Sequence, residues 1–361
     1  MGISDILEHL SALVGCDTQN PPRDIRGDSP VMDYCSQALG SDFEVEITDH
    51  GSGHVSFYAH RGRPQTLFNV HLDTVPLGPG WDSDPLELEV TDDRAVGRGA
   101  CDIKGAAACL LAIASTRPQN LALLFTTDEE GAEGKCVRAF CESGAIKSYR
   151  QVIVAEPTAC EAVLGHRGFL SVESLFHGSP GHSSEARALY ENAIHQMTRW
   201  AASALDLAER QQPSMEQAGT CLNLGFTWGG TANNVIAGES LVRWSARLLP
   251  GSSNLQFLEE IKACAPGSAR VDWQIVHDGK PLPAGGQNDT DAVKFAERLK
   301  LARGKDVDFW TEASIFSQFG CPAMVLGPGQ IAQAHIANEW VTLAQLEQAC
   351  ELYGRIISND E

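Results

Sequence analysis

Hydrophobic residues recur along the first part of the chain in two spacings, one typical of helices and one of strands. Near the N-terminus the apolar positions fall on one face of a predicted helix, at Ile3, Ile6, Leu7, Leu10, Leu13 and Val14. Apolar runs typical of strands follow at HVSFYAH, TLFNVH, LALLFTT and QVIVAE, with the Ala-rich helical segment KGAAACLLAIAST between the second and the third. Because strands that alternate with helices usually form a parallel sheet, this region predicts an α/β domain around a mixed, largely parallel sheet.

The pattern changes at about residue 167. From there the segments read strand, helix, two strands, helix and strand, including a long helical stretch from Glu185 to Gln211. This order is typical of a compact ferredoxin-like α+β domain. Because helix and strand patterns resume after it, we predict one domain over residues 1–166 and 279–361, with a second domain inserted over residues 167–278.

Composition narrows the partners of the protein. The 361 residues carry 27 Lys and Arg against 47 Asp and Glu, a formal net charge of −20, so no basic face for a nucleic-acid backbone is expected. The N-terminus lacks the basic and apolar regions of a signal peptide, and no run of about eighteen apolar residues predicts a membrane span. Eleven cysteines without a C-x-x-C pair indicate reduced thiols and hence a cytoplasmic protein.

Polar side chains stand at the ends of the apolar runs. His71 ends TLFNVH, Asp102 precedes the Ala-rich helix, Glu129 and Glu130 follow LALLFTT, and Glu156 ends QVIVAE. The carboxyl ends of parallel strands meet at one edge of a sheet, where carboxylates would repel one another unless a cation neutralised them. Histidine and carboxylate ligands suit zinc or a similar first-row metal, and a bridging aspartate can hold two ions. The sequence therefore predicts a metal site at this edge.

Each of these residues also has an ordinary explanation. A histidine at a strand end is most often structural, an aspartate before a helix is usually an N-cap, and adjacent acidic residues after a strand often form a solvated turn. These explanations would all have to hold together at four matching positions. The metal site is the preferred interpretation for that reason.

The motifs HLDTVP, GRGACDIKG, TTDEEGAEG, VAEPT, GHSS and AQAHIANEW occur in the order seen in dinuclear zinc amidohydrolases and peptidases of the M20 family. The chain resembles that family over nearly its whole length. It is most similar to the acetylornithine deacetylase group, with the related acetylcitrulline deacetylases, through VAEPT, GHRGFLS, DFWTEASIF and GPGQIAQAHIANEWVTLAQLEQ. The resemblance implies a zinc-exopeptidase-like catalytic domain and an inserted domain that serves as lid and dimerisation surface.

The resemblance also assigns a metal-binding role to five residues. His71 would bind one zinc ion and His335 the other, with Asp102 bridging the two. Glu130 and Glu156 would complete the sites, one each. The implied cofactor is two Zn²⁺ per chain, with Co²⁺ as the alternative metal.

The resemblance implies catalytic roles for Glu129 and Asp73. Glu129 would be the general base that takes a proton from the attacking water and returns it to the leaving amine. Asp73 would orient the His71 imidazole, and its alternative role is a turn-forming aspartate before Thr74. The peptide bond after the bridging aspartate, Asp102-Ile103, is expected to be cis.

The remaining implied roles fall within the predicted insert. His182 would stabilise the oxyanion of the partner subunit's reaction, and its alternative is a surface residue at a helix start. Asn234 and Arg247 match positions that contact substrate in relatives, and Arg167 is expected as a further substrate residue that pairs with a carboxylate. Arg243 or Arg247 could instead be an ordinary cation on a strand surface.

The function implied is a cytoplasmic, homodimeric zinc amidohydrolase that removes the acetyl group of N-acetylornithine in arginine biosynthesis. The substrate is thus a small N-acyl amino acid. The alternatives are N-acetylcitrulline, or another M20 activity such as succinyl-diaminopimelate desuccinylase or a carboxypeptidase-like dipeptidase. A different class is a metal-dependent binding protein without turnover, which the presence of Glu129 disfavours.

Overall fold

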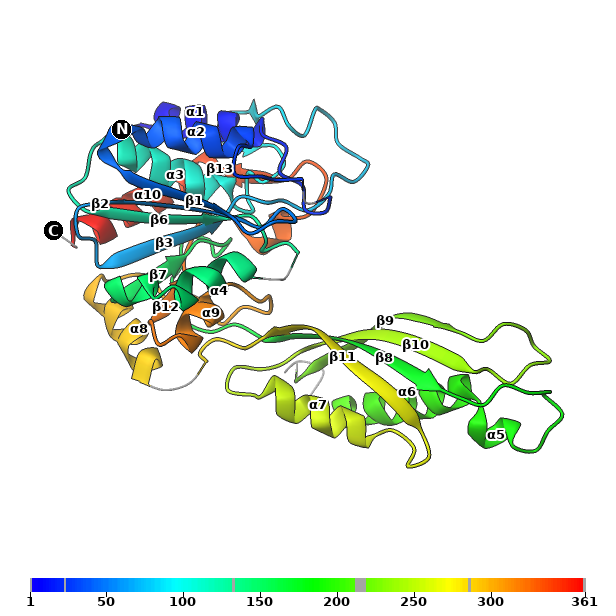
Figure 1. The fold of residues 1–361 in the computed structure, drawn as a ribbon. Helices are drawn as coiled ribbons and strands as arrows, with labels where there is room; N and C mark the ends of the chain where they lie inside the picture. Colours follow the sequence, from blue (N-terminus) through cyan, green and yellow to red (C-terminus); the bar gives the residue numbers. More distant parts are fainter. Residues whose placement is uncertain (1, 23, 132–133, 212–218, 285–286, 360–361) are drawn as a thin grey trace. The chain divides into compact units, whose positions relative to one another are not determined.

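The computed structural model describes residues 2–22, 24–131, 134–211, 219–284 and 287–359. The chain forms two compact units, each coloured by sequence in Figure 1. The first comprises Met1–Gly165, Pro283–Asp306 and Thr311–Glu361, and the second comprises His166–Leu282 and Val307–Trp310. No helix of the described residues is long and apolar enough for a bilayer crossing.

The first unit is built on a six-stranded sheet. In spatial order its strands are β1 (Glu44–Asp49), β2 (Val55–Arg61), β6 (Leu121–Thr126), β3 (Thr66–His71), β7 (Gln151–Val154) and β12 (Ala323–Val325). β3 pairs in parallel with both β6 and β7, and β7 pairs in parallel with β12. β1 pairs with β2 in antiparallel fashion, and β2 pairs with β6 in the same way. This mixed, largely parallel sheet confirms the predicted fold class.

Helices lie on both sides of this sheet (Figure 1). On one side are α1 (Ile3–Val14), α2 (Pro30–Leu39) and α3 (Lys104–Ser115), and on the other are α4 (Lys135–Glu142) and α9 (Ala313–Gln318). α3 is buried along almost its whole length, because its small side chains let it pack closely against α1 and α10. The other elements of this unit are α8 (Gln287–Arg298), α10 (Leu343–Ser358), η1 (Gly40–Asp42), η2 (Ala145–Ser148) and η3 (Ile331–Gln333).

A small three-stranded sheet also belongs to the first unit. Its order is β13 (Trp340–Thr342), β5 (Arg94–Val96) and β4 (Glu89–Val90). β13 and β5 are antiparallel, with Trp340 opposite Val96. The pairing brings the segment before Asp102 next to the segment after His335, although they are far apart in the sequence.

The second unit is a four-stranded antiparallel sheet packed on helices. The strands, in spatial order, are β11 (Arg270–Gly279), β8 (Phe169–His177), β10 (Glu239–Arg247) and β9 (Cys221–Gly229). Burial alternates along β8 and β10, so one face of the sheet is covered. Its core includes Phe176 and Trp244 of the strands and Trp200 of α6. The helices are α5 (Ala188–Glu191), α6 (Ala193–Gln211) and α7 (Asn254–Ala263).

The helical stretch expected from Glu185 to Gln211 is interrupted. Asn192 has an extended backbone, with φ −82° and ψ 121°, and it separates α5 from α6. Its side-chain oxygen accepts a hydrogen bond from the backbone N–H of Ile194 at 2.9 Å. An asparagine that satisfies a free N–H in this way begins a new helix, which the apolar spacing alone does not reveal.

Candidate metal centre

The strand ends deliver polar side chains to one edge of the large sheet. His71 is the last residue of β3, and Glu129 and Glu130 follow the end of β6. Glu156 follows the end of β7, and Asp102 lies two residues before α3. Because β3 is parallel to both β6 and β7, these strands end on the same side. These polar residues therefore lie at the carboxyl edge of the sheet.

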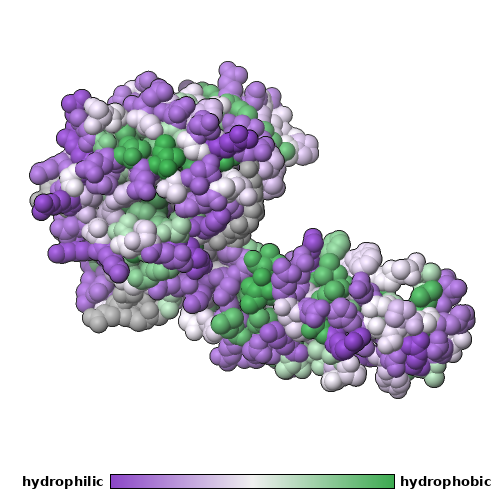
Figure 2. All heavy atoms as spheres, in the orientation of Figure 1, coloured by the Kyte–Doolittle hydropathy of each residue, from purple (hydrophilic) through white to green (hydrophobic). Residues whose placement is uncertain are grey.

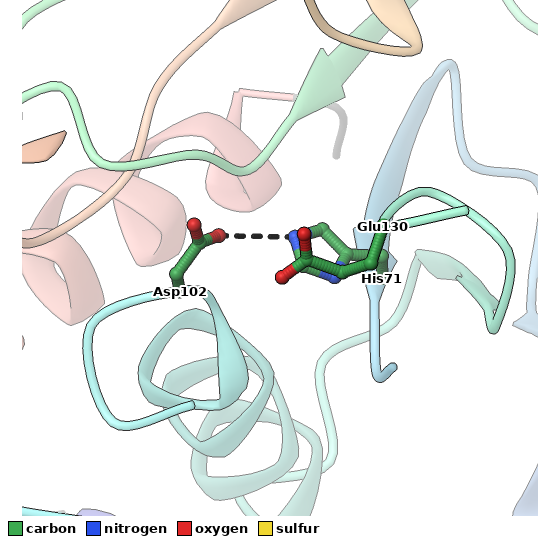
Figure 3. A group of neighbouring side chains, drawn as sticks. All are labelled: His71, Asp102 and Glu130. Atoms are coloured by element: carbon green, nitrogen blue, oxygen red, sulfur yellow. Dashed lines mark hydrogen bonds and ion pairs between the residues drawn. The ribbon is translucent and has the colours of Figure 1, made fainter. Parts of the chain in front are cut away.

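Asp102 lies between two imidazoles. Its Oδ1 is 3.1 Å from His71 Nε2, and its Oδ2 is 3.2 Å from His335 Nε2. Glu130 Oε1 lies 3.1 Å from His335 Nε2, whereas Glu156 Oε1 lies 3.8 Å from His71 Nε2. Figure 3 shows His71, Asp102 and Glu130 turned toward one another, and their ligand atoms lie within 4.8 Å. The geometry thus forms two donor sets that share one aspartate.

The protonation of His71 leaves one ring nitrogen directed at the carboxylates. Its Nδ1 is 2.9 Å from the carbonyl oxygen of Asp73, which can only accept, so Nδ1 carries the hydrogen. In a neutral imidazole Nε2 then presents a lone pair to Asp102. A lone pair facing a carboxylate at 3.1 Å needs a proton or a metal ion to be favourable.

The buried charges shift one another's pKa values. Burial raises the pKa of Glu156 and of Glu130, and the charge of Asp102 raises both further. Burial alone would also raise the pKa of Asp102, but hydrogen bonds from His335 and His71 hold it below its ordinary value. The hydrogen bonds to Asp102 and Glu130 raise the pKa of His335 to about 10. These groups are therefore strongly coupled by charge.

The donor set fits divalent first-row metals. Glu156 Oε1 is buried and accepts no hydrogen bond from the residues that the structure describes. An unpaired, buried carboxylate oxygen is costly unless a cation meets it. Imidazole nitrogens and carboxylate oxygens are ligands of zinc, so these residues could hold metal ions.

Glu129 and Asp73 flank this cluster. Burial raises the pKa of Glu129 well above the usual carboxyl range, and the charges of Glu130 and Asp102 add to the rise. Asp73 is fully buried, and its Oδ2 accepts from Glu130 N at 3.0 Å and from Asn20 Nδ2 at 3.1 Å. Asp73 therefore contacts residues of both donor sets. It reaches the His71 ring mainly through its backbone oxygen.

Three residues around the centre were not anticipated from the sequence. Asn20 donates to Asp73, and Glu339 accepts from the backbone N–H of Asp102 at 2.9 Å. Arg98 donates to Glu339 at 2.8 Å. Arg98 lies within the GRGACDIKG motif and Glu339 within AQAHIANEW. Their membership of these motifs was the only feature of the sequence that could have suggested a role near the site. The Asp102-Ile103 peptide is cis, as expected.

The second unit brings His182 and Asn234 together. The backbone N–H of Ser183 donates to the carbonyl of Asn234 at 3.1 Å, and His182 forms a bridge with Val235. Both His182 and Asn234 are exposed, and His182 Nδ1 lies 2.7 Å from Ser184 Oγ. These two predicted site residues therefore share one corner of the unit.

The predicted arginines lie near the other end of β10. Arg167 is buried, with Nε 2.6 Å from Asp308 Oδ1 and Nη1 2.6 Å from the carbonyl of Gly219. Arg247 ends β10, and its guanidinium lies 3.8 Å from the centroid of the Phe169 ring. Arg167 thus serves at least a structural role in this unit.

The two ends of β10 are too far apart for one small substrate to contact residues at both ends within one copy of the unit. β10 holds nine residues, and at about 3.3 Å per residue its ends lie about 26 Å apart. His182 and Asn234 precede β10, whereas Arg247 ends it. Arg243, between them, forms an ion pair with Glu173 at 2.6 Å.

Comparison with known proteins shows the family to which the chain belongs. The chain is 44% identical to N-acetyl-L-citrulline deacetylase of Xanthomonas campestris pv. campestris, over 99% of this chain and 98% of that protein. It is 31% identical to acetylornithine deacetylase of Proteus mirabilis, over 90% and 87%. The YxeP protein of Bacillus subtilis, described as a dinuclear metal-binding peptidase from the M20 family, has the same fold, with a TM-score of 0.67, 12% identity and coverage of 98% and 97%. The model of peptidase family M20/M25/M40 matches residues 67–359, so the chain belongs to this family.

Proposed function

We propose that this protein is a metal-dependent deacetylase that hydrolyses the acetyl amide of a small N-acetyl amino acid. The observation that carries the proposal is Asp102 held between His71 and His335, with one glutamate beside each histidine. The identity to relatives decides which substrate we propose first. The sequence motifs placed N-acetylornithine first, whereas the 44% identity to an acetylcitrulline deacetylase favours N-acetyl-L-citrulline over N-acetyl-L-ornithine.

The proposed ligands are His71, Asp102 and Glu156 for one metal ion and His335, Asp102 and Glu130 for the other. Zinc is the metal that the mixture of imidazole and carboxylate donors suits, and cobalt has similar preferences. When bound, these ions supply Lewis acidity to the acyl carbonyl and to water. Asp73 contributes by fixing the His71 tautomer through its carbonyl oxygen.

Glu129 is the proposed general base. It takes the proton of the attacking water as the new carbon–oxygen bond forms, and it gives that proton to the amine nitrogen as the carbon–nitrogen bond breaks. The products are acetate and the free amino acid. A carboxyl whose pKa is raised by burial and by neighbouring charge is suited to hold the proton between these two steps.

The insert is proposed to act across a homodimer. Because His182 and Arg247 lie near opposite ends of β10, one small substrate could contact both only if they come from different copies. The outer strand β9 pairs only with β10 among the described residues, and it carries Phe226 and Trp228, 48% and 53% exposed. Figure 2 shows apolar residues on the surface of the second unit. An exposed apolar edge strand favours association.

In this arrangement His182 of one subunit stabilises the oxyanion that develops in the other subunit's site. Asn234 and Arg247 bind the substrate, with Arg167 as a further carboxylate partner. A cytoplasmic location and a role in arginine biosynthesis complete the proposal. All eleven cysteines are free thiols, which supports the location.

A substrate panel tests the proposal. The purified protein, loaded with zinc or cobalt, is assayed on N-acetyl-L-citrulline, N-acetyl-L-ornithine, succinyl-diaminopimelate and a dipeptide, and kcat/KM is compared. We expect the highest value for N-acetyl-L-citrulline and none for protein stripped of metal. Faster hydrolysis of the succinyl compound or the dipeptide would reassign the substrate. No turnover of any compound by fully loaded protein would favour the non-catalytic binding protein.

A further inference from the structure

A buried ion pair outside the proposed ligand set joins the segments that carry Asp102 and His335. Arg98 Nη1 lies 2.8 Å from Glu339 Oε2, and the two side chains are 2% and 1% exposed. Arg98 lies four residues before Asp102, and Glu339 lies four residues after His335. β5 and β13 pair directly beside them, so the ion pair stands where the two segments meet.

The second oxygen of Glu339 holds the backbone of the shared aspartate. Oε1 accepts from the N–H of Cys101 at 3.0 Å and from the N–H of Asp102 at 2.9 Å. The carbonyl of Glu339 accepts from the N–H of Gly97 at 2.9 Å. One carboxylate thus fixes the peptide from which the Asp102 side chain projects. It also ties that peptide to the chain that carries His335.

The His335 segment needs such support because its backbone is unusual. His335 and Asn338 have φ values of 61° and 57°, in the left-handed region that side chains other than glycine seldom adopt. Asn338 and Asp82 exchange two hydrogen bonds, of 2.9 and 2.7 Å. Arg98 also packs over the ring of Trp81, at 5.1 Å from its centroid. The segment is therefore held by contacts from residues 81–98.

The two histidines differ in how they are held. The His71 side chain is 2% exposed and ends a strand buried along its whole length. The His335 side chain is 47% exposed and follows a short 3₁₀ helix rather than a buried strand. Its distance from Asp102 consequently depends on the segment that Glu339 anchors.

We propose that Arg98 and Glu339 are positioning residues that set the spacing of Asp102 and His335, and thereby the affinity of the second metal ion. This inference rests on the proposed metal-dependent function. A buried ion pair is a weak source of stability by itself, because its desolvation offsets much of its attraction. Its hydrogen bonds to Cys101 and Asp102 give it a specific structural task. His71 itself is held by the buried strand β3 and by the carbonyl oxygen of Asp73, so its position depends less on this ion pair than that of His335 does.

Titration of the metal-free full-length protein with Co²⁺ tests the inference, with binding heat and visible absorption as readouts that need no turnover. Glu339→Gln keeps an acceptor for the two backbone N–H groups but turns an amide toward Arg98, leaving a buried cation unpaired. We expect the second Co²⁺ to bind about 10- to 100-fold more weakly, as is typical when a residue behind a metal ligand is lost, because both Asp102 and His335 would shift. The first Co²⁺ shares Asp102 but keeps His71 and Glu156, so its affinity should fall by a smaller factor.

Two further variants separate positioning from general stability. Arg98→Met combined with Glu339→Gln removes the unpaired cation while the two amides keep their acceptor, so part of the second affinity should return. Thr66→Val is the matched control. It removes a buried hydrogen bond from Gln151 at the opposite end of β3 from His71, 2.7 Å long. The control should lower Tm and leave both Co²⁺ affinities unchanged.

The outcomes are distinguishable. Wild-type affinities in Glu339→Gln, or an equal loss of the second ion in Thr66→Val, would overturn the positioning role. A wild-type protein that takes up no second ion would overturn the proposed metal centre as well. If Glu339→Gln does not fold, Arg98→Lys replaces it. Lysine keeps the charge without the planar guanidinium, so the second affinity should fall by a smaller factor.

Discussion

Two adjacent glutamates occupy different positions relative to the metal centre. Glu130 Oε1 lies 3.1 Å from His335 Nε2, and the backbone N–H of Glu130 donates to Asp73 Oδ2. Glu129 is half-buried, and the structure shows no histidine bound to its carboxylate among the described residues. Consecutive side chains project in different directions from a turn, so one can bind metal while the other faces the reacting atoms. This geometry favours Glu129 as the base.

Replacement of Glu129 by Gln should separate these roles. The variant keeps the shape of the side chain but cannot accept a proton, so we expect turnover to fall by roughly 10² to 10⁴ while both metals remain bound. Elemental analysis of the variant and kcat measurements check the two halves of the prediction. Glu130→Gln is the comparison and should lose metal. If instead Glu129→Gln lost metal and excess metal restored its activity, the two glutamates would have to exchange roles.

At the scale of helices and strands, the large sheet was predictable at its centre and less so at its margins. Buried β3, β6 and β7 are continuous apolar runs with polar residues at their ends, so His71, Glu130 and Glu156 could be placed from the sequence. β1 was missed although its sequence EVEITD alternates polar and apolar residues, because it carries only two apolar side chains and lies exposed at the edge of the sheet. Apolar patterning reports burial, and it reports little where a strand is solvated.

The contacts between distant segments could not be predicted in the same way. Arg98 and Glu339 are separated by 241 positions in the sequence, and no local pattern indicates that they pair. The residues Val307–Trp310 similarly join the second unit although they lie far beyond the predicted insert. The role of His335 could be suggested only by family resemblance, because it follows no strand. Such pairings depend on the tertiary fold.

The junction of β6 and α9 contains a buried acid whose effect on stability should depend on pH. Glu312 precedes α9 and accepts from Thr126 Oγ1 at 3.0 Å, and burial together with the charge of Asp128 raises its pKa to about 8. Between pH 4.5 and 8 the folded protein keeps this proton while the unfolded chain releases it. The free energy of unfolding therefore decreases as pH rises through this range.

Glu312→Gln removes that titration and preserves an acceptor for Thr126. Relative to wild type, the metal-free variant should gain about 2 kcal/mol in free energy of unfolding between pH 6 and pH 8. Urea unfolding of chelated protein at the two pH values measures the difference. Glu351→Gln, at an exposed position of α10, is the control and should parallel the wild type. An equal offset at both pH values would show that Glu312 is already ionised at pH 6.

For the whole molecule, the proposed function requires each site to combine residues of two subunits. The first unit supplies the metal centre, and the second unit carries His182 and Asn234. Two copies related by a two-fold axis would each give and receive the same residues. Such an assembly predicts that two inactive variants, each lacking a different residue of the site, regain activity when their subunits pair.

Mixing His182→Ala chains with Glu129→Ala chains tests this assembly. In each mixed dimer one site would contain both an intact base and an intact partner histidine, so up to half of the wild-type activity per mixed dimer should return. Subunit exchange is followed separately, with differently tagged chains resolved by native mass spectrometry. If exchange occurs without recovery of activity, His182 acts within its own subunit or has no catalytic role.

The close packing of α3 has a consequence for engineering this protein. Asp102 stands two residues before a helix whose positions from Lys104 to Ala114 are all buried, and a methyl group added at Gly105 would come within 2.5 Å of the carbonyl of Ala100. Enlarging side chains here would displace the helix as a body and Asp102 with it. Core substitutions in α3 that are chosen to raise Tm could therefore alter metal binding. A directed-evolution library would best vary the solvated helices and leave α3 unchanged.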